Sequence, residues 1–139
     1  MKNNKSLGTW AEQQALIYLQ NFGYFLIAKN YHSRYGEIDL IVKNHQYLVF
    51  VEVKARAKTK YGQAIEVISY SKQKKIIKTA LQFLNQNSQF NDDFCRFDVI
   101  CFDFDHKISK SVQQKFDDYV YDLNWIENAF NFDAELINL

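Results

Sequence analysis

The chain has 139 residues, of which 47% are hydrophobic and 17% aromatic, and its formal net charge is +1. These values are typical of a single domain over residues 1–139, with a flexible N-terminus at residues 1–6, and they exclude a disordered chain. Because no apolar run reaches the roughly 18 residues of a membrane-spanning helix and the polar start lacks a signal peptide's hydrophobic stretch, we expect a cytoplasmic protein without membrane contact.

The first element that the sequence predicts is an amphipathic helix over residues 6–22. Its apolar residues recur at helical spacing, and Gly23 follows as a stop. These apolar residues are Leu7, Trp10, Ala11, Ala15, Tyr18, Leu19 and Phe22. A short strand over residues 25–28 comes next, and residues 30–35 form a polar loop that leads to the following element.

Two hydrophobic stretches, residues 36–42 and 48–54, are separated by a few polar residues and predict a β-hairpin. Side chains in a strand alternate between two faces, so Glu52 and Lys54 share one face while valines fill the other. Folding the hairpin can bring Asp39 beside Glu52, with Lys54 one step along. Charged residues inside apolar strands must be paired or bound to an ion, because their unpaired burial is costly.

The C-terminal half predicts a second helix over residues 71–87 and a strand over residues 97–104. Residues 109–120 are ambiguous, and residues 123–130 predict a closing helix. The order α-β-β-β-α-β, followed by a C-terminal hairpin or helix, predicts an α/β fold with a sandwich around a mixed β-sheet.

Two carboxylates held side by side repel each other unless a cation lies between them, and hard oxygen ligands of this kind suit Mg²⁺. A metal ion bound by Asp39 and Glu52 would polarise a phosphodiester and acidify a bound water. The ammonium group of Lys54 would then position that water or stabilise charge on the reacting phosphate. The alternative is a solvated or structural ion-pair cluster, since cross-strand ion pairs are common.

The pattern of an aspartate, twelve intervening residues and then Glu-x-Lys at the end of a hydrophobic strand resembles the PD-(D/E)XK nuclease core. This core is found in restriction endonucleases and archaeal Holliday-junction resolvases. Longer strings are similar to the YraN-like family of small bacterial proteins. They are Gly36-Glu37-Ile38-Asp39-Leu40-Ile41, Phe50-Val51-Glu52-Val53-Lys54-Ala55-Arg56, then Gly62, Val67, Lys72 and Arg96-Phe97-Asp98-Val99-Ile100. The likeness covers nearly the whole chain.

The resemblance implies a restriction-endonuclease-like α/β/α sandwich and a metal-dependent endonuclease that hydrolyses phosphodiester bonds with Mg²⁺ or Mn²⁺. It implies that Asp39 and Glu52 are metal ligands and that Lys54 is the catalytic lysine. Glu12, on the first helix, matches the acidic residue that completes the metal site in related nucleases.

Basic residues concentrate in one part of the chain. Residues 54–78 hold eight basic residues and one acid, whereas residues 103–135 hold eight acids and three lysines. We expect a basic surface that delivers a nucleic-acid backbone to the acids, and the alternative is an ordinary solvated helix face. The predicted nucleic-acid ligands are Arg34, Arg56, Lys58, Lys72 and Lys75. Lys72 is favoured by the resemblance alone, and Arg34 stands near His32, where the family usually has arginine.

Tyr31, Tyr35, Tyr47 and Tyr61 have the chemistry to stack on unpaired bases, and the alternative for them is packing and rim contacts. We expect Asp98, two residues after an arginine, to be structural. The histidines lack ligand spacing and the glycines are isolated, so the sequence predicts neither a zinc site nor a P-loop.

Two hypotheses of different classes follow. The first is a metal-dependent endonuclease acting on DNA, which the related resolvases lead us to expect to be branched or structured, with a homodimer or a protein partner. The second is a non-catalytic nucleic-acid-binding or adaptor protein that keeps the nuclease scaffold. The sequence leaves open whether catalysis is retained, whether DNA or RNA is bound, and which metal is used.

Overall fold

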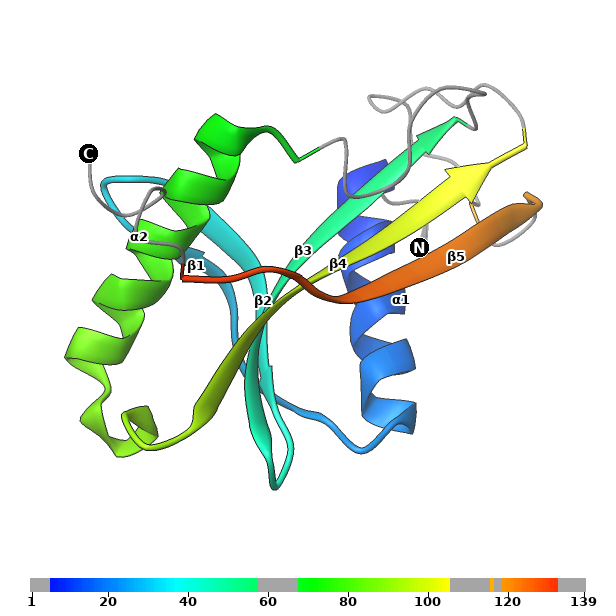
Figure 1. Cartoon of the computed structure of the whole chain (residues 1–139). Coiled ribbons are helices and arrows are strands. Elements are labelled where there is room, and N and C mark those ends of the chain that lie inside the picture. Colours follow the sequence, from blue (N-terminus) through cyan, green and yellow to red (C-terminus); the bar gives the residue numbers. More distant parts are fainter. Residues whose placement is uncertain (1–5, 58–67, 106–115, 117–118, 133–139) are drawn as a thin grey trace.

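Two helices flank a five-stranded mixed sheet in the computed structural model, which describes residues 6–57, 68–105, 116 and 119–132 (Figure 1). The elements in chain order are α1 (Leu7–Asn21), β1 (Phe25–His32), β2 (Glu37–Lys43), β3 (Tyr47–Ala57), α2 (Tyr70–Gln86), η2 (Ser88–Phe90), β4 (Phe94–Phe104) and β5 (Tyr121–Phe130). The strands lie in the order β1-β2-β3-β4-β5; β3 and β4 are parallel, and the other neighbours are antiparallel. The predicted α/β sandwich around a mixed sheet is confirmed.

Each helix begins at a serine cap. The hydroxyl oxygen of Ser6 accepts a hydrogen bond from the backbone N–H of Thr9 at 3.3 Å, and that of Ser69 accepts one from Lys72 at 3.1 Å. These contacts satisfy N–H groups that the first turn of a helix leaves unpaired. Gly23 follows α1 with a φ of +91°, a conformation that favours glycine. Neither of these two described helices has the length and apolarity needed to cross a membrane.

The sheet separates two hydrophobic cores because residues of β3 alternate between its faces. Val49 and Val51 lie in the core that includes Trp10 of α1, whereas Leu48 and Phe50 lie in the core that includes Ile77 of α2. The predicted alternation is therefore confirmed. The same alternation directs Glu52 and Lys54, which share a face with Leu48 and Phe50, toward α2.

The predicted helices over residues 6–22 and 71–87 agree with α1 and α2 to within one residue at each end. The closing helix expected over residues 123–130 is wrong, because this segment is strand β5. Its apolar residues fit both periodicities, and pairing with the free edge of β4 decides between them. Ile100 pairs with Trp125 and Phe102 with Leu123, so this segment adds one antiparallel strand to the sheet.

The end of the first strand also differs from the one predicted from the sequence. Strand β1 continues to His32, into the expected loop, because Tyr31 pairs with Ile38 and His32 with Glu37. Most of the ambiguous segment, residues 109–120, lies outside the described residues.

The turn between β2 and β3 is held by Asn44, whose side-chain oxygen accepts hydrogen bonds from the N–H groups of Gln46 at 2.9 Å and Tyr47 at 2.7 Å. From this turn the two strands pair as far as Leu40 and Val51. Beyond that pair, β1 and β2 curve away from β3 and β4, which Figure 1 shows as a fork at the upper end of the sheet. The candidate site lies at this fork.

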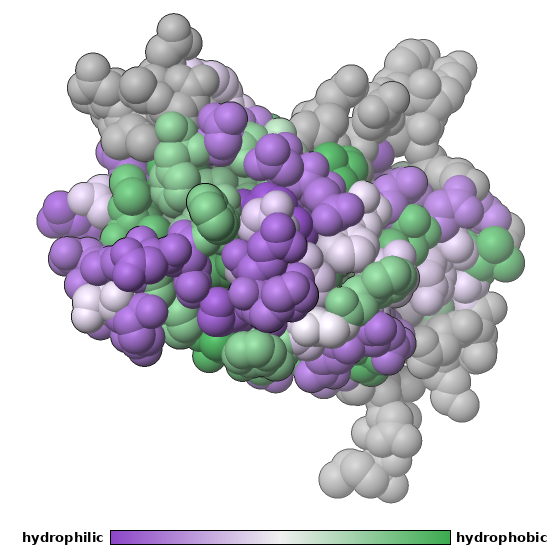
Figure 2. Space-filling model, turned by 60° about the horizontal axis from the view of Figure 1, so that its bottom comes forward, coloured by the Kyte–Doolittle hydropathy of each residue, from purple (hydrophilic) through white to green (hydrophobic). Residues whose placement is uncertain are grey.

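The opposite end of the molecule, near the β2–β3 turn, carries exposed aromatic side chains. Phe94 is 72% exposed, and Phe22 and Phe25 are also exposed. Figure 2 shows that hydrophilic side chains divide the apolar surface on this face into separate areas. The face is therefore mixed in character.

Candidate functional site

Asp39 and Glu52 lie together where β2 separates from β3. The side-chain Oδ2 of Asp39 accepts a hydrogen bond from the backbone N–H of Val53 at 2.8 Å. The aspartate thus replaces a backbone acceptor that β2 no longer offers to β3, and this contact anchors its carboxyl group next to that of Glu52. The structure brings the two predicted acids together.

Both carboxyl groups are poorly hydrated. The side chain of Glu52 is only 4% exposed, and burial together with the charge of Glu52 raises the pKa of Asp39 to about 8. Loss of water and a like charge both disfavour ionisation of a carboxyl group. Without a divalent metal ion, the pair therefore retains a proton near neutral pH. A divalent cation would replace that proton, and hard carboxylate oxygens suit Mg²⁺ or Mn²⁺.

Two lysines approach the same oxygen of Glu52. The distance from its Oε2 to Nζ of Lys72 is 2.5 Å, and that to Nζ of Lys54 is 3.6 Å. Burial, together with Lys72, lowers the pKa of Lys54. Partial burial alone would lower the pKa of Lys72. Contacts that include its hydrogen bond to Glu52 raise this pKa overall. Lys72 is thus a persistent cation, and Lys54 releases its proton more readily than an ordinary lysine.

Lys72 belongs to the acidic site itself, whereas the sequence placed it only on the nucleic-acid surface. In the sequence, the position of Lys72 near the start of a basic helix gives only a weak indication of this role. The contact with Glu52 depends on how α2 packs on the sheet.

Glu12 of α1 lies at the border of this site. It lines a hollow of about 100 Å³ that also includes Asn30 and Leu40. Burial raises the pKa of Glu12, a hydrogen bond with Asn30 opposes the shift, and the charges of Glu37 and Glu52 add to it. Within the described residues, no three His, Cys, Asp or Glu side chains lie close enough together to hold a metal ion.

The residues present fit a hard divalent cation with two protein ligands, Asp39 and Glu52. Magnesium is usually held by one or two carboxylates, with water and substrate phosphate oxygens completing its coordination. Burial and the charge of Glu52 raise the pKa of Asp39, although two lysines lie close to Glu52. Glu12 adds negative potential from α1.

The predicted nucleic-acid ligands Arg34 and Lys75 are exposed. Lys75 lines a hollow of about 210 Å³ beside the acidic site, together with Lys72, Gly36 and Glu37. Arg34 lies in the β1–β2 loop and donates a hydrogen bond to the hydroxyl group of the adjacent tyrosine at 2.8 Å. Both side chains are available to a phosphate backbone.

Arg56 has a different environment from the other predicted nucleic-acid ligands. Its Nε donates a hydrogen bond to Oδ1 of buried Asp103 at 2.6 Å, and this contact raises the pKa of Arg56. Arg56 therefore neutralises a buried acid between β3 and β4. Lys58 lies outside the described residues.

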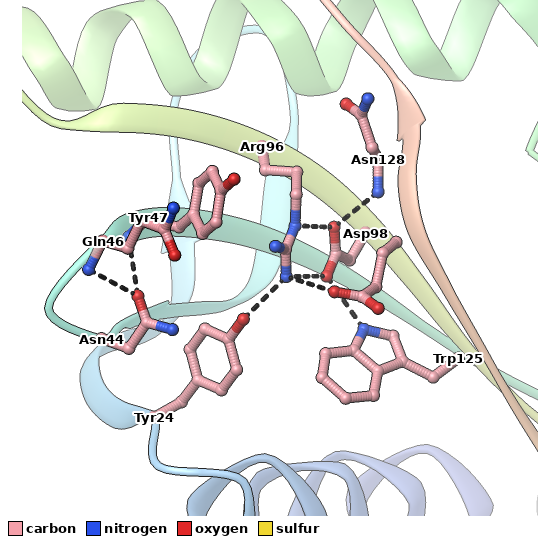
Figure 3. A network of polar contacts seen from close by, with 9 residues as sticks. Tyr24, Asn44, Gln46, Tyr47, Arg96, Asp98, Trp125 and Asn128 are labelled. Atoms are coloured by element: carbon pink, nitrogen blue, oxygen red, sulfur yellow. Dashed lines mark hydrogen bonds and ion pairs between the residues drawn. The ribbon is translucent and has the colours of Figure 1, made fainter.

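A second polar network lies on the α1 face of the sheet, around Asp98 (Figure 3). The carboxylate of Asp98 is fully buried and accepts hydrogen bonds at 2.9 Å from Nε and Nη2 of Arg96, Nε1 of Trp125 and the backbone N–H of Asn128. Arg96 also donates to the hydroxyl group of Tyr24 at 2.8 Å. Four protein donors occupy the carboxylate, which agrees with the structural role expected for Asp98.

A family model described as "Uncharacterised protein family UPF0102" matches residues 11–102 of this chain. A UPF0102 protein of Acinetobacter baumannii (strain AYE) is 59% identical over 129 residues, which cover 93% of this chain and 97% of the relative. A UPF0102 protein of Acinetobacter baylyi is 58% identical over 124 residues, 89% of each chain. One of Clostridium acetobutylicum is 39% identical over 127 residues, 91% of this chain and 95% of the relative. The matched segment includes both acids and both lysines of the site.

Proposed function

This chain belongs to UPF0102, the family of YraN-like proteins, and from its site we propose that it is a metal-dependent endonuclease that hydrolyses phosphodiester bonds in DNA. The observation that carries the proposal is the apposition of Asp39 and Glu52 at the fork of the sheet, with Lys54 and Lys72 on the same oxygen. Two poorly hydrated carboxylates and a lysine of lowered pKa form a costly arrangement, which catalysis explains better than stability does.

Each side chain has a role in this proposal. Asp39 and Glu52 would hold Mg²⁺ or Mn²⁺, which supplies activation of the phosphate and of a water when bound. Lys54 lies within 3.6 Å of Glu52, and its lowered pKa suits it to accept a proton from the attacking water. Lys72 would turn its positive charge to the phosphate once a metal ion neutralises Glu52.

The surroundings of the acids suit a nucleic-acid backbone. Lys72 and Lys75 line the hollow next to the site, and Arg34 projects from the loop that leads into β2. A nucleic-acid backbone whose phosphate groups pair with these cations would reach the carboxylates of Asp39 and Glu52. Because such contacts read only the backbone, they favour recognition of DNA structure over recognition of a sequence.

Two observations favour a second function. The ammonium group of Lys72 already neutralises Glu52, and the described residues hold no cluster of three metal-ligating side chains. A protein that binds nucleic acid without cutting it would keep such an internally compensated site. We therefore hold a non-catalytic nucleic-acid-binding protein as the alternative.

Cleavage and binding measured together distinguish the two functions. Purified protein is incubated with supercoiled plasmid and with branched DNA in Mn²⁺, beside the variants Asp39→Ala and Lys54→Ala and a control, Asp92→Asn, which changes an exposed acid before β4. The endonuclease proposal expects nicking by the wild type and the control, and none by the other two variants. Nicking that survives in Asp39→Ala contradicts it. Binding by all four proteins without nicking supports the alternative.

A further inference from the structure

The four tyrosines with the chemistry to stack on bases occupy different environments. The ring of Tyr31 packs edge-on against a core phenylalanine at 5.2 Å between ring centres. Tyr47 lies 4.7 Å from an arginine guanidinium that belongs to the network of Figure 3. Tyr61 lies outside the described residues. Tyr35 differs from Tyr31 and Tyr47, because it lines a hollow on the surface.

This hollow is shallow and open to solvent, has a volume of about 370 Å³ and lies against α2. Its lining residues are Tyr35, Lys78, Leu81, Gln82 and Asn85. The set combines an aromatic ring, an exposed apolar side chain, a cation and two amides. Amide side chains both donate and accept hydrogen bonds, which allows them to meet the polar edge of any base.

Two cations flank the ring of Tyr35. The guanidinium carbon of Arg34 and Nζ of Lys78 each lie 5.0 Å from the ring centre. Contacts of this kind between solvent-accessible groups are weaker than the stacking of a base on an aromatic ring. A base can therefore displace them, and both cations remain near enough to pair with its phosphate groups.

The backbone that carries Tyr35 is held in place by α2. The hydroxyl oxygens of Ser33 and buried Thr79 are 2.7 Å apart, and Oγ of Ser33 accepts hydrogen bonds from the N–H groups of Tyr35 at 3.0 Å and Gly36 at 3.3 Å. At Gly36 a Cβ atom would lie 3.4 Å from Cβ of Lys75, so the loop packs directly on the helix. Little ordering of this backbone is needed when a ligand binds.

The hollow is close to the acidic site along both chain segments that form it. Tyr35 precedes Asp39 by four residues, so their Cα atoms are at most roughly 14 Å apart. Between them, Gly36 and Glu37 line the second hollow together with Lys72 and Lys75. A nucleic-acid strand that passes from one hollow to the other therefore leads from the ring of Tyr35 to the carboxylates of Asp39 and Glu52.

We propose that the hollow beside Tyr35 binds one unpaired nucleotide, with its base stacked on the Tyr35 ring and its phosphate groups paired with Arg34 and Lys78. This inference rests on the proposed function, because it names the substrate class: DNA with an unpaired nucleotide a short distance from the bond that is cut. A continuous duplex keeps its bases stacked inside the helix and leaves the hollow unfilled unless a base is flipped out.

The test measures equilibrium binding of the full chain by fluorescence anisotropy, with EDTA present so that cleavage does not occur. The two probes are a blunt duplex and the same duplex with a bulge of unpaired thymines. We expect the wild type to prefer the bulged probe. Tyr35→Ala lowers its affinity for that probe by about tenfold and changes duplex affinity by about twofold or less, whereas Tyr35→Phe keeps the preference.

Tyr70→Ala is the matched control. Tyr70 is 53% exposed at the start of α2, Nζ of Lys74 lies 5.5 Å from its ring centre, and it is not part of the lining of the hollow. Its loss leaves the preference for the bulged probe intact. Equal affinity of the wild type for both probes, or an equal loss for both in Tyr35→Ala, overturns the inference and leaves the endonuclease proposal standing. Absence of wild-type binding to either probe overturns both proposals.

Discussion

The ammonium group of Lys72 lies 2.5 Å from Oε2 of Glu52, a carboxylate that is almost fully buried between the sheet and α2. The contact joins the helix that carries the basic residues to the strand that carries the acid. In the absence of metal, Lys72 supplies part of the positive charge that a divalent cation would bring. If the proposed metal ion binds at Glu52, it and Lys72 would therefore compete for one oxygen.

Replacing Lys72 by methionine is expected to strengthen binding of Mn²⁺ severalfold in the absence of DNA, because the carboxylate no longer has an internal counter-charge. Isothermal titration calorimetry near neutral pH measures the affinity directly. Lys75→Met is the control, since this lysine lines the neighbouring hollow and is exposed. Equal affinities in the two variants would show that Lys72 and the metal ion do not compete.

Asp39→Asn is expected to stabilise the metal-free protein while removing metal-dependent cleavage. The unfolded chain releases this proton near the ordinary pKa of 3.8, whereas the folded chain holds it up to about 8. The folded state binds more protons between these values, so the wild-type free energy of unfolding falls as the pH rises through that window. Asparagine carries no charge and keeps an oxygen to accept the hydrogen bond of Val53.

Urea unfolding at one pH inside that window and at another just above it checks this expectation. Near pH 8 the variant gains about 1 kcal/mol or more over the wild type, since one unit of pKa shift corresponds to about 1.4 kcal/mol. Its stability also varies less with pH than that of the wild type. A variant that loses stability as steeply as the wild type would place the abnormal proton on another group.

Lys75→Ala is expected to weaken DNA binding without regard to DNA structure. Its ammonium group is exposed beside the acidic site, where it can pair with a phosphate. The slope of log K against log salt concentration falls in magnitude by about 1 when one phosphate contact is lost. Anisotropy titrations at several salt concentrations measure the slope. Lys43→Ala, which removes a lysine that lies 3.0 Å from Asp93 near the β2–β3 turn, leaves the slope unchanged.

Asp98→Asn is expected to destabilise the fold by about 3 kcal/mol, because largely buried Arg96 would lose its buried anion and keep only the exposed carboxylate of Glu127, 3.3 Å away. Equilibrium unfolding in urea gives the change. Asp98 lies on the α1 face, so DNA binding and Mn²⁺ affinity of the folded variant stay at wild-type values. If the variant folds with normal stability but no longer cleaves DNA, the catalytic site would lie in this network and not at the fork.

Strand alternation was enough to predict that Glu52 and Lys54 share a face, and the short turn was enough to bring Asp39 next to them. The nature of the last element was beyond local patterns. The apolar residues of 123–130 suit a helix as well as a strand, and the unpaired edge of β4 decides the outcome. The role proposed for Tyr35 also depends on the tertiary structure, since its neighbours in the hollow come from α2.

The amino-acid sequence by itself determined two helices, an alternating hairpin and the identity of the acids, because periodicity and turn length are local properties of a chain. Only the tertiary structure decided where β2 leaves β3, that Lys72 reaches Glu52 and that Arg56 is paired with Asp103. These relationships join residues that are distant in the chain, and they depend on how the sheet twists and how α2 packs on it. No periodicity within one segment contains that information.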